Sequence, residues 1–240
     1  MSERVGRLER TAGANGTATS DTAVDIAEAA ARRPPGGRTR RLNEARILEA
    51  AEAVFAEAGF TGASMQAIAE KAGLPKANLH YYFGTKEGLY RTLLSHILDM
   101  WVDAFEHIAP ERDPAEALAA YIRDKMRWSR TRPLASKVFA NEVIHGAQQI
   151  EGYLGTKLRS RVEDKAKVIE GWIATGRMAP VDPKHLFFSL WATTQTYADF
   201  EVQVRRVLGC ETLGSADYDH ATDQVIGLML RGCGLVSKNG

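Results

Sequence analysis

The sequence has few of the features that mark secreted, metal-binding or membrane proteins. Its two cysteines, Cys210 and Cys233, form neither a CxxC pair nor another spacing typical of a metal site. We therefore expect buried or free thiols and no metal or other cofactor. The longest apolar runs, such as residues 186–190, are far too short to span a bilayer, and the N-terminus lacks the charged-then-apolar order of a secretion signal. These absences predict a cytoplasmic protein without a membrane partner.

An excess of charge of one sign is also missing. The chain has 31 basic residues against 30 acidic ones, so its net charge gives no argument for nucleic acid. A protein that docks on DNA through one face needs only a local basic patch. Residues for such a patch are present, although a solvated charge run beside a linker explains them equally well: Arg38, Arg40, Arg41, Arg46, Lys76 and Lys86.

No stretch of useful length alternates apolar and polar residues as a strand does, which predicts an all-α fold. Gly-rich phosphate loops, HExxH and a Ser-His-Asp spacing are missing too, so we do not expect an enzyme. Two alternatives stay open: a small-molecule enzyme that uses His145 with Glu142 one helical turn away, and a helical adaptor that binds only protein. With 240 residues, 45% of them apolar, the chain suits one small and one larger domain.

What the sequence does contain is a pair of short helices joined by a tight turn, between Ser64 and Phe83. Ser64 can cap a helix with an apolar inner face, and Gly73 ends that helix. Pro75 suits the first turn of a second helix, which we expect to start at about Lys76. Two such helices make a helix-turn-helix. The second exposes side chains able to bond phosphates or base edges: Lys76, Asn78, His80 and Tyr81.

Such corners also occur in helical proteins that never meet DNA, but the flanking residues favour the DNA interpretation. Ala-Glu-Ala-Gly-Phe-Thr-Gly-Ala-Ser leads into the motif, and Leu-His-Tyr-Tyr-Phe-Gly-Thr-Lys-Glu-Gly-Leu-Tyr completes it. With these motifs, residues 42–93 resemble the DNA-binding domain of the TetR family of transcriptional regulators. The resemblance implies a three-helix head that binds operator DNA and a larger helical body that binds a small molecule. It also implies a homodimer that releases its operator when the small molecule binds.

The resemblance further implies roles for single residues. In family members, the lysine at the position of Lys86 begins a long helix and holds a phosphate, and the aromatic at Tyr82 contacts the DNA backbone. Together with the motif and the basic flank, this gives a set of candidate DNA-binding residues: Arg41, Ser64, Lys76, Asn78, His80, Tyr81, Tyr82 and Lys86.

We divide the chain into a disordered arm at residues 1–38, a helix-turn-helix domain at 39–85, and a ligand-binding and dimerisation domain at 86–236. The arm is rich in Ala, Gly, Thr and Arg and can bury little apolar surface. Caps, prolines and apolar spacing predict the helices: 42–58, 64–72, 76–83, 85–107, 113–130, 134–149, 153–175, 183–208 and 218–235.

Polar side chains on two body helices that otherwise suit burial are the candidates for ligand binding. Asn141 and His145 lie on one of these helices with Phe139, and Gln195 follows Trp191 by one turn on the other. Buried polar groups need partners, and a cleft that receives a polar ligand can supply them. Bonds between helices also supply them, and for any one residue this is the commoner case.

Two segments, Phe-Ala-Asn-Glu-Val-Ile-His-Gly and Trp-Ala-Thr-Thr-Gln-Thr-Tyr-Ala-Asp-Phe, resemble the C-terminal domain of the pyrimidine-utilisation regulators within the TetR family. These are of the RutR type, which senses uracil and thymine. A pyrimidine has a flat face, and an imide edge of acceptor, donor and acceptor groups. Trp191 suits the face, and the amides of Gln195 and Asn141 suit the edge. The ligand candidates are therefore Phe139, Asn141, His145, Trp191 and Gln195.

The sequence thus predicts a transcriptional repressor that uracil, thymine or a similar nitrogenous ring releases from its operator, in control of pyrimidine or related nitrogen catabolism. A TetR-type regulator with a different effector is the alternative. We expect a homodimer that pairs through the last two helices, whose apolar residues exceed what one body needs: Phe187, Phe188, Trp191, Val225, Leu228 and Met229.

Overall fold

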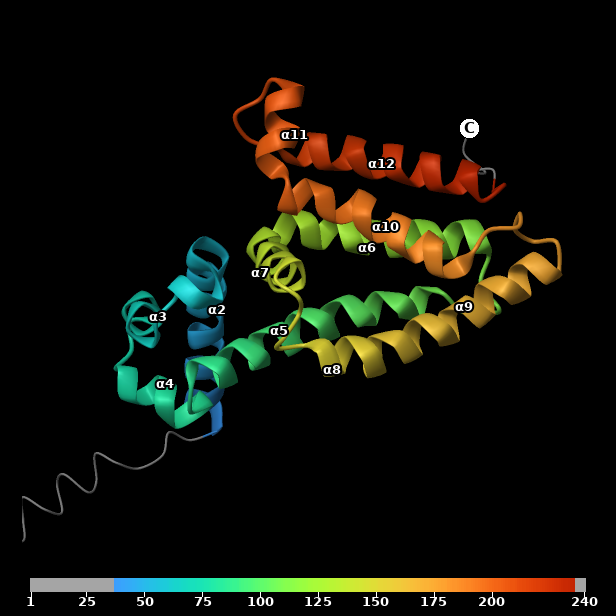
Figure 1. The fold of residues 1–240 in the computed structure, drawn as a ribbon. Coiled ribbons are helices and arrows are strands. Elements are labelled where there is room, and N and C mark those ends of the chain that lie inside the picture. Colours follow the sequence, from blue (N-terminus) through green and yellow to red (C-terminus); the bar gives the residue numbers. More distant parts are fainter. Residues whose placement is uncertain (1–36, 236–240) are drawn as a thin grey trace, which may run out of the picture. The chain divides into compact units, whose positions relative to one another are not determined.

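The computed structural model describes residues 37–235, and the chain divides into two compact units, Met1–Asn43 and Glu44–Gly240. The arm predicted at residues 1–38 lies outside the described residues, except for Gly37 and Arg38, which are helical. The regular structure of the described part is helical, which confirms the all-α prediction (Figure 1). No helix of this part is long and apolar enough to cross a membrane.

Helices α2 (Gly37–Gly62), α3 (Met65–Ala72) and α4 (Lys76–Phe83) make up the head, and the part of α2 after Asn43 belongs to the second unit with the other two. Their shared core includes Phe55 from α2, Ile68 from α3 and Leu79 from α4, each 1% exposed or less. Gly59 kinks α2, with φ 66° and ψ 178°. A residue with a Cβ adopts such a φ only under strain, so glycine is required there.

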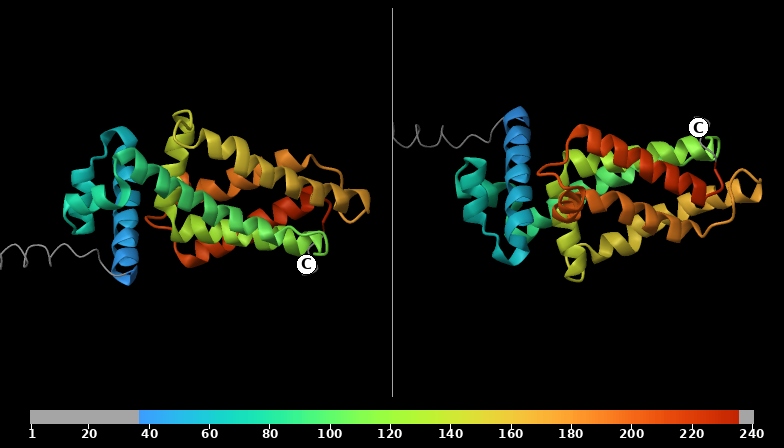
Figure 2. Two further views of the ribbon diagram at one scale, coloured as in Figure 1. Left: turned by 90° about the horizontal axis from the view of Figure 1, so that it is seen from below. Right: turned by 90° about the horizontal axis from the view of Figure 1, so that it is seen from above.

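Eight further α-helices form the body. They are α5 (Lys86–Asp103), α6 (Pro114–Thr131), α7 (Pro133–Ile144), α8 (Glu151–Tyr153), α9 (Arg159–Ala174), α10 (Pro183–Asp199), α11 (Glu201–Leu208) and α12 (Ser215–Gly232). A short 3-10 helix, η1 (Ala104–His107), extends α5, and a π-helical turn, η2 (Leu154–Leu158), joins α8 to α9. Helices α6, α10 and α12 pack on one another, as Figures 1 and 2 show from three sides.

Several helix starts agree with the sequence because their caps are local. Asp113 accepts hydrogen bonds from two backbone N–H groups at the start of α6, and Asp182 does the same for α10. A proline follows each cap at the first helical position, where its missing N–H costs nothing.

Two predicted helix extents are wrong because the backbone leaves the helical conformation earlier than the apolar spacing indicates. The helix predicted to reach Gln149 ends at Ile144, where the buried Glu142 carboxylate accepts the Gln149 backbone N–H at 2.7 Å instead. The helix predicted for residues 183–208 is interrupted at Phe200, whose φ of −112° and ψ of 29° separate α10 from α11.

The buried apolar residues form two cores, and α5 takes part in both. One core joins the head to the first turns of the body and includes α5 from Leu89 to Trp101, with Val138 of α7. The other lies among η1, α6, α9, α10 and α12, and α5 enters it through Val102. A movement of α5 therefore disturbs the packing of head and body together.

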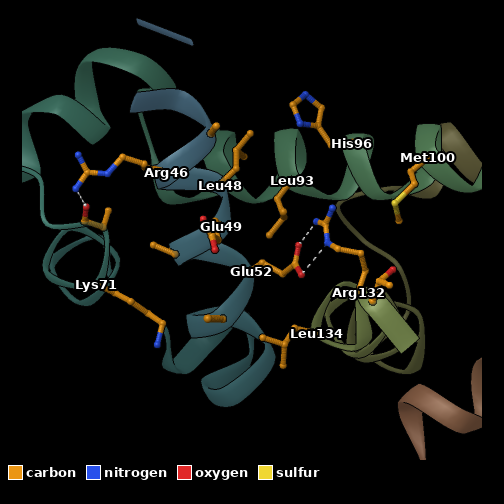
Figure 3. Close-up of a pocket in the computed structure, with 15 residues that line it drawn as sticks. Arg46, Leu48, Glu49, Glu52, Lys71, Leu93, His96, Met100, Arg132 and Leu134 are labelled. Atoms are coloured by element: carbon orange, nitrogen blue, oxygen red, sulfur yellow. Dashed lines mark hydrogen bonds and ion pairs between the residues drawn. The ribbon is translucent and has the colours of Figure 1, made fainter. Parts of the chain in front are cut away.

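An ion pair also joins head and body within the second unit. Glu52 of α2 is 7% exposed, and its carboxylate accepts from Arg132, at the junction of α6 and α7, over 2.5 Å and 3.4 Å. Figure 3 shows the two side chains meeting in this two-pronged arrangement at a groove of about 1000 Å³. The Arg132 side chain is 47% exposed, whereas the Glu52 side chain is only 9% exposed.

This asymmetry predicts unequal losses when the pair is broken. Arg132→Met leaves a buried carboxylate unpaired and should lower the free energy of unfolding by about 1–3 kcal/mol. Glu52→Gln removes the buried charge and leaves the guanidinium hydrated, so its loss should stay below about 1 kcal/mol. Urea unfolding followed by circular dichroism measures both values, and a larger loss in Glu52→Gln would contradict the predicted order.

Candidate nucleic-acid interface and ligand cavity

Local chemistry builds the turn between α3 and α4. The Ser64 hydroxyl accepts the backbone N–H of Ala67 at 3.1 Å and so caps α3, as the sequence predicted. Gly73 ends α3 in the left-handed conformation, with φ 61° and ψ 37°. Pro75 then precedes α4, which begins at Lys76. Ser64 is exposed, but one of its lone pairs is already engaged in the cap.

Helix α4 presents the predicted side chains on its outer face. Lys76, His80 and Tyr81 are exposed, and Asn78 is half-buried, while Leu79 is fully buried against the head core. His80 Nδ1 lies 2.8 Å from the backbone oxygen of Gly84. A carbonyl only accepts, so Nδ1 must carry the proton in this bond. The other ring nitrogen of His80, Nε2, therefore remains available for a contact at the surface of the head.

The two residues assigned to DNA phosphates on resemblance have neighbours within the head. Tyr82 is half-buried, with its ring 5.1 Å from that of Tyr81. The Lys86 ammonium donates to the backbone oxygens of Phe60 at 2.8 Å and Ala63 at 3.0 Å and lies 4.6 Å from the Phe60 ring centroid. An ammonium has three N–H groups, so one remains for a phosphate. The structural role of Lys86 was not predicted.

The first turn of α5, where Lys86 lies, is fixed by a helix cap and by a close backbone contact. Thr85 Oγ1 accepts the Gly88 backbone N–H at 3.1 Å and caps the helix, as predicted. A Cβ on Gly88 would lie 2.4 Å from the backbone oxygen of Phe83, so no other residue fits without a backbone shift. Arg41 lies in the first unit, on α2, and is exposed.

The body contains a small cavity with walls from six elements. Its volume is about 50 Å³, and α5, η1, α6, α7, η2 and α10 surround it. Its lining is mostly aromatic and aliphatic, with two polar side chains, Lys125 and Gln195. Three of the five predicted ligand residues line it: Phe139, Trp191 and Gln195.

The other two predicted ligand residues do not line the cavity. Asn141 lies two positions after Phe139, and residues two apart on a helix point in different directions. His145 lies beyond the last turn of α7, is exposed, and bonds the Asn141 backbone oxygen through Nδ1 at 2.7 Å. His145 therefore caps the end of α7.

Trp191 offers the cavity its ring rather than its N–H. Its indole Nε1 donates to the Tyr121 hydroxyl at 2.8 Å, and burial raises the pKa of that hydroxyl, which keeps it neutral. The Phe187 ring packs against the indole, with 6.3 Å between centroids and 29° between the ring planes. The hydrogen bond and the stack fix the orientation of Trp191, and Gln195 follows one turn along the same face of α10.

Lys125 is the cavity residue that sequence reasoning missed. It is 3% exposed, its ammonium lies 4.2 Å from the Trp101 ring centroid, and burial lowers its pKa to about 7. The signal was available, because Lys125 interrupts the buried stripe of α6 four positions after Tyr121 and four before Ser129. Nearby, Asp199 Oδ1 and Ser136 Oγ are buried without a hydrogen-bond partner among the described residues.

The groove in Figure 3 is much larger than the cavity but has a different character. It is lined by charged residues of the head and body, including Arg46, Glu49 and Lys71, and by none of the predicted ligand residues. The described residues contain no group of three or more His, Cys, Asp or Glu side chains that could hold a metal ion.

Comparisons with known proteins agree with both halves of this architecture. Residues 47–93 match the family model described as bacterial regulatory proteins, tetR family, and residues 94–236 match that of the YcdC-like protein C-terminal region. The HTH-type transcriptional regulator RutR of Escherichia coli O157:H7 is 38% identical over 199 residues, which cover 82% of this chain and 94% of that protein.

Two solved structures illustrate the shared fold. The ketosteroid transcriptional regulator KstR2 of Mycobacterium tuberculosis superposes with a TM-score of 0.64 at 20% identity, over 79% of this chain and 94% of that one. The complex of AibR with isovaleryl coenzyme A and operator DNA gives a TM-score of 0.59 at 20% identity, over 78% of this chain and 97% of that one. At these identities the likeness concerns the fold alone.

Proposed function

The chain belongs to the TetR family of bacterial transcriptional regulators, and we propose that it is a cytoplasmic repressor that uracil, thymine or a similar nitrogenous ring releases from its operator. The observation that carries the proposal is the aromatic cavity beside Gln195. The identity to a RutR protein over most of both chains supports the same ligand class.

The size and lining of the cavity support a small, flat, polar effector. A volume of about 50 Å³ has room for only a few waters, since one water needs roughly 10–15 Å³ on this measure. A ligand the size of coenzyme A would not fit. The rings of Phe139 and Trp191 offer faces to a planar ligand, and the Gln195 amide offers both a donor and an acceptor to its edge.

The DNA interface of the proposal is the outer face of α4. Lys76, His80 and Tyr81 can reach phosphates and base edges, as in a helix-turn-helix whose second helix enters the major groove. The start of α5 adds backbone N–H groups and the third N–H of Lys86.

The cavity can influence the head by two routes. Leu98 and Trp101 of α5 line the cavity, and α5 begins next to α4. Arg132 lies with the cavity residues Lys125 and Gln195 around a gap too narrow for a water, and it holds Glu52 of the head. An effector that prefers one arrangement of these residues shifts the protein toward it. A coupling of about 1–3 kcal/mol would change operator affinity by roughly 5- to 150-fold.

The proposed protein acts as a homodimer that pairs α10 and α12 with the same helices of a second copy. Phe188 on α10 is 51% exposed and Leu228 on α12 is 59% exposed, large apolar side chains that the body itself does not cover. Two other residues expected in this seam are buried within the subunit itself: Phe187 is 0% exposed and Val225 is 6% exposed.

We predict that two lysines of the head differ in what their removal changes. Lys76→Ala should reduce the slope of log affinity against log salt by about 0.9, the value for one phosphate, with unchanged stability. Lys86→Ala should reduce the slope similarly and also lower the free energy of unfolding by about 1–3 kcal/mol, because two backbone oxygens lose their donor.

Fluorescence anisotropy over a salt series and urea unfolding measure the two effects. Lys167→Ala, an exposed lysine on α9, is the matched control. If both head variants have the same free energy of unfolding, the Lys86 hydrogen bonds do not stabilise the head. If the salt-dependence slopes do not change, α4 does not contact DNA.

Effector binding is tested by Gln195→Leu, which keeps similar bulk but cannot bond a ligand edge. We expect DNA binding without ligand to stay near wild type, while the uracil concentration that releases DNA rises at least about tenfold. Thr193→Val, a substitution on the same helix outside the cavity lining, is the control. If Gln195→Leu responds like wild type, the site is wrong. If no pyrimidine releases the wild-type protein, the effector class is wrong and the TetR assignment stands.

Dimerisation is tested by Leu228→Glu, which places a charge in the proposed seam. This variant should run as a monomer by light scattering at micromolar concentration, where we expect the wild type to be a dimer. Ile144→Glu, at a position on α7 that is 73% exposed, should remain dimeric. A monomeric wild type, or a dimeric Leu228→Glu, would disprove the α10 and α12 seam.

A further inference from the structure

Lys125 is buried although it forms neither a hydrogen bond nor an ion pair with the described residues. Its ammonium makes no hydrogen bond to any residue that the structure describes, although Lys125 is only 3% exposed. Asp199 on α10 acts on it electrostatically, but no nitrogen–oxygen pair of the two residues comes within the 4.0 Å of an ion pair. The contact with the Trp101 ring, 4.2 Å to the centroid, offsets only part of the cost of removing an ammonium from water.

The ammonium is placed where a ligand would meet it. Lys125, Trp101 and Gln195 line the cavity of about 50 Å³ and also border, with Arg132 and Ser136, a gap that is too narrow for a water. Lys125 comes from α6 and Gln195 from α10, so the two polar groups approach the shared space from different helices. The remaining cavity walls are apolar apart from the Tyr121 hydroxyl, whose oxygen accepts the Trp191 N–H and whose own O–H is a further donor.

We propose that Lys125 selects the effector by donating a hydrogen bond to one of its oxygens, so that the cavity accepts rings with an oxygen acceptor at that edge and refuses rings with an amino group there. The inference rests on the proposed function, because it assigns a second polar contact to the ligand held by Gln195. An ammonium only donates hydrogen bonds, whereas a side-chain amide can donate or accept them. Lys125 therefore distinguishes an oxygen from an amino group on the ligand, and Gln195 can bond either. The oxygen can be a neutral carbonyl or an anionic oxygen, since both accept from an ammonium.

The test compares three six-membered rings by isothermal titration calorimetry. Uracil offers neutral carbonyl oxygens, barbiturate offers an anionic oxygen, and 2,4-diaminopyrimidine carries amino groups in place of both uracil carbonyls. The wild type should bind 2,4-diaminopyrimidine at least about 100-fold more weakly than uracil. Lys125→Met should bind uracil about 10- to 100-fold more weakly than wild type and lose most of that discrimination. Arg123→Met removes an exposed charge from the same helix and should bind like wild type.

The barbiturate arm identifies the kind of oxygen. If Lys125→Met loses more affinity for barbiturate than for uracil, the preferred partner is anionic, and equal losses indicate a carbonyl. Unchanged uracil affinity in Lys125→Met, or an equal loss in Arg123→Met, would overturn the role of Lys125 while leaving the proposed function in place. If the wild type binds none of the three rings, the proposed function fails and the inference fails with it.

A pH series on the wild type tests the inference without any variant. Burial lowers the pKa of Lys125 to about 7, and a ligand oxygen favours the charged form, so binding takes up a proton above that pH. Uracil affinity should be level below pH 7 and fall by up to tenfold per pH unit above it. The other ionisable groups facing this space are Asp199 of α10, Tyr121 of α6 and Arg132, and burial raises the pKa values of Asp199 and Tyr121.

Neither of those shifts produces a loss between pH 7 and 8.5, because the phenol stays neutral and a deprotonated Asp199 favours the charged ammonium of Lys125. The walls from α5 and α7 carry no ionisable side chain. A level profile from pH 6 to 8.5 would therefore overturn the inference even if Lys125→Met does not fold.

Discussion

Helix α5 packs into both hydrophobic cores, and this is the constraint on which the described structure depends. The residues from Leu89 to Trp101 fill the core that includes the head, and Val102 enters the core of the body. An interior packed at this density does not stretch to absorb a displaced helix, so its side chains exchange one arrangement for another. A regulator needs this property, because a gradual deformation would be absorbed before it reached the DNA. The cavity lies against the same helix, where Trp101 forms part of its wall.

Sequence reasoning succeeded where structure is decided within a few residues. The bounds of α3 and α4 follow from the Ser64 cap, the left-handed Gly73 and Pro75 before the second helix, and each of these acts over one turn of chain. The exposed face of α4 follows from helix periodicity once Leu79 is placed inside. The family resemblance carried the domain order beyond these local signals, and the family models confirm it.

It failed at the end of α7, where the local stop signal of Gly146, which has φ 95°, was overlooked. It also failed where the deciding contact comes from elsewhere in the chain. Phe139 lines the cavity and Asn141 does not. Which face of α7 turns toward α10 depends on how the two helices pack, and helix periodicity alone does not predict that packing. Lys86 was assigned to DNA alone, although two backbone oxygens of the preceding loop hold it. Lys125 was visible as a charge within an apolar stripe, but its position over the Trp101 ring without a hydrogen-bond acceptor was visible only in three dimensions.

In the proposed mechanism, the length of α5 would turn a small change at the cavity into a larger one at the DNA. Trp101 lies 15 residues after Lys86, a distance of about 22 Å along the helix axis. A tilt of about 5° about the Trp101 end would carry the other end sideways by about 2 Å, and two heads moving apart would change their separation by about 4 Å. Successive major grooves on one face of DNA lie about 34 Å apart, and hydrogen bonds fail beyond about 3.5 Å. In the proposed dimer, a rotation of a few degrees would therefore be enough to move both recognition helices out of register with the major grooves.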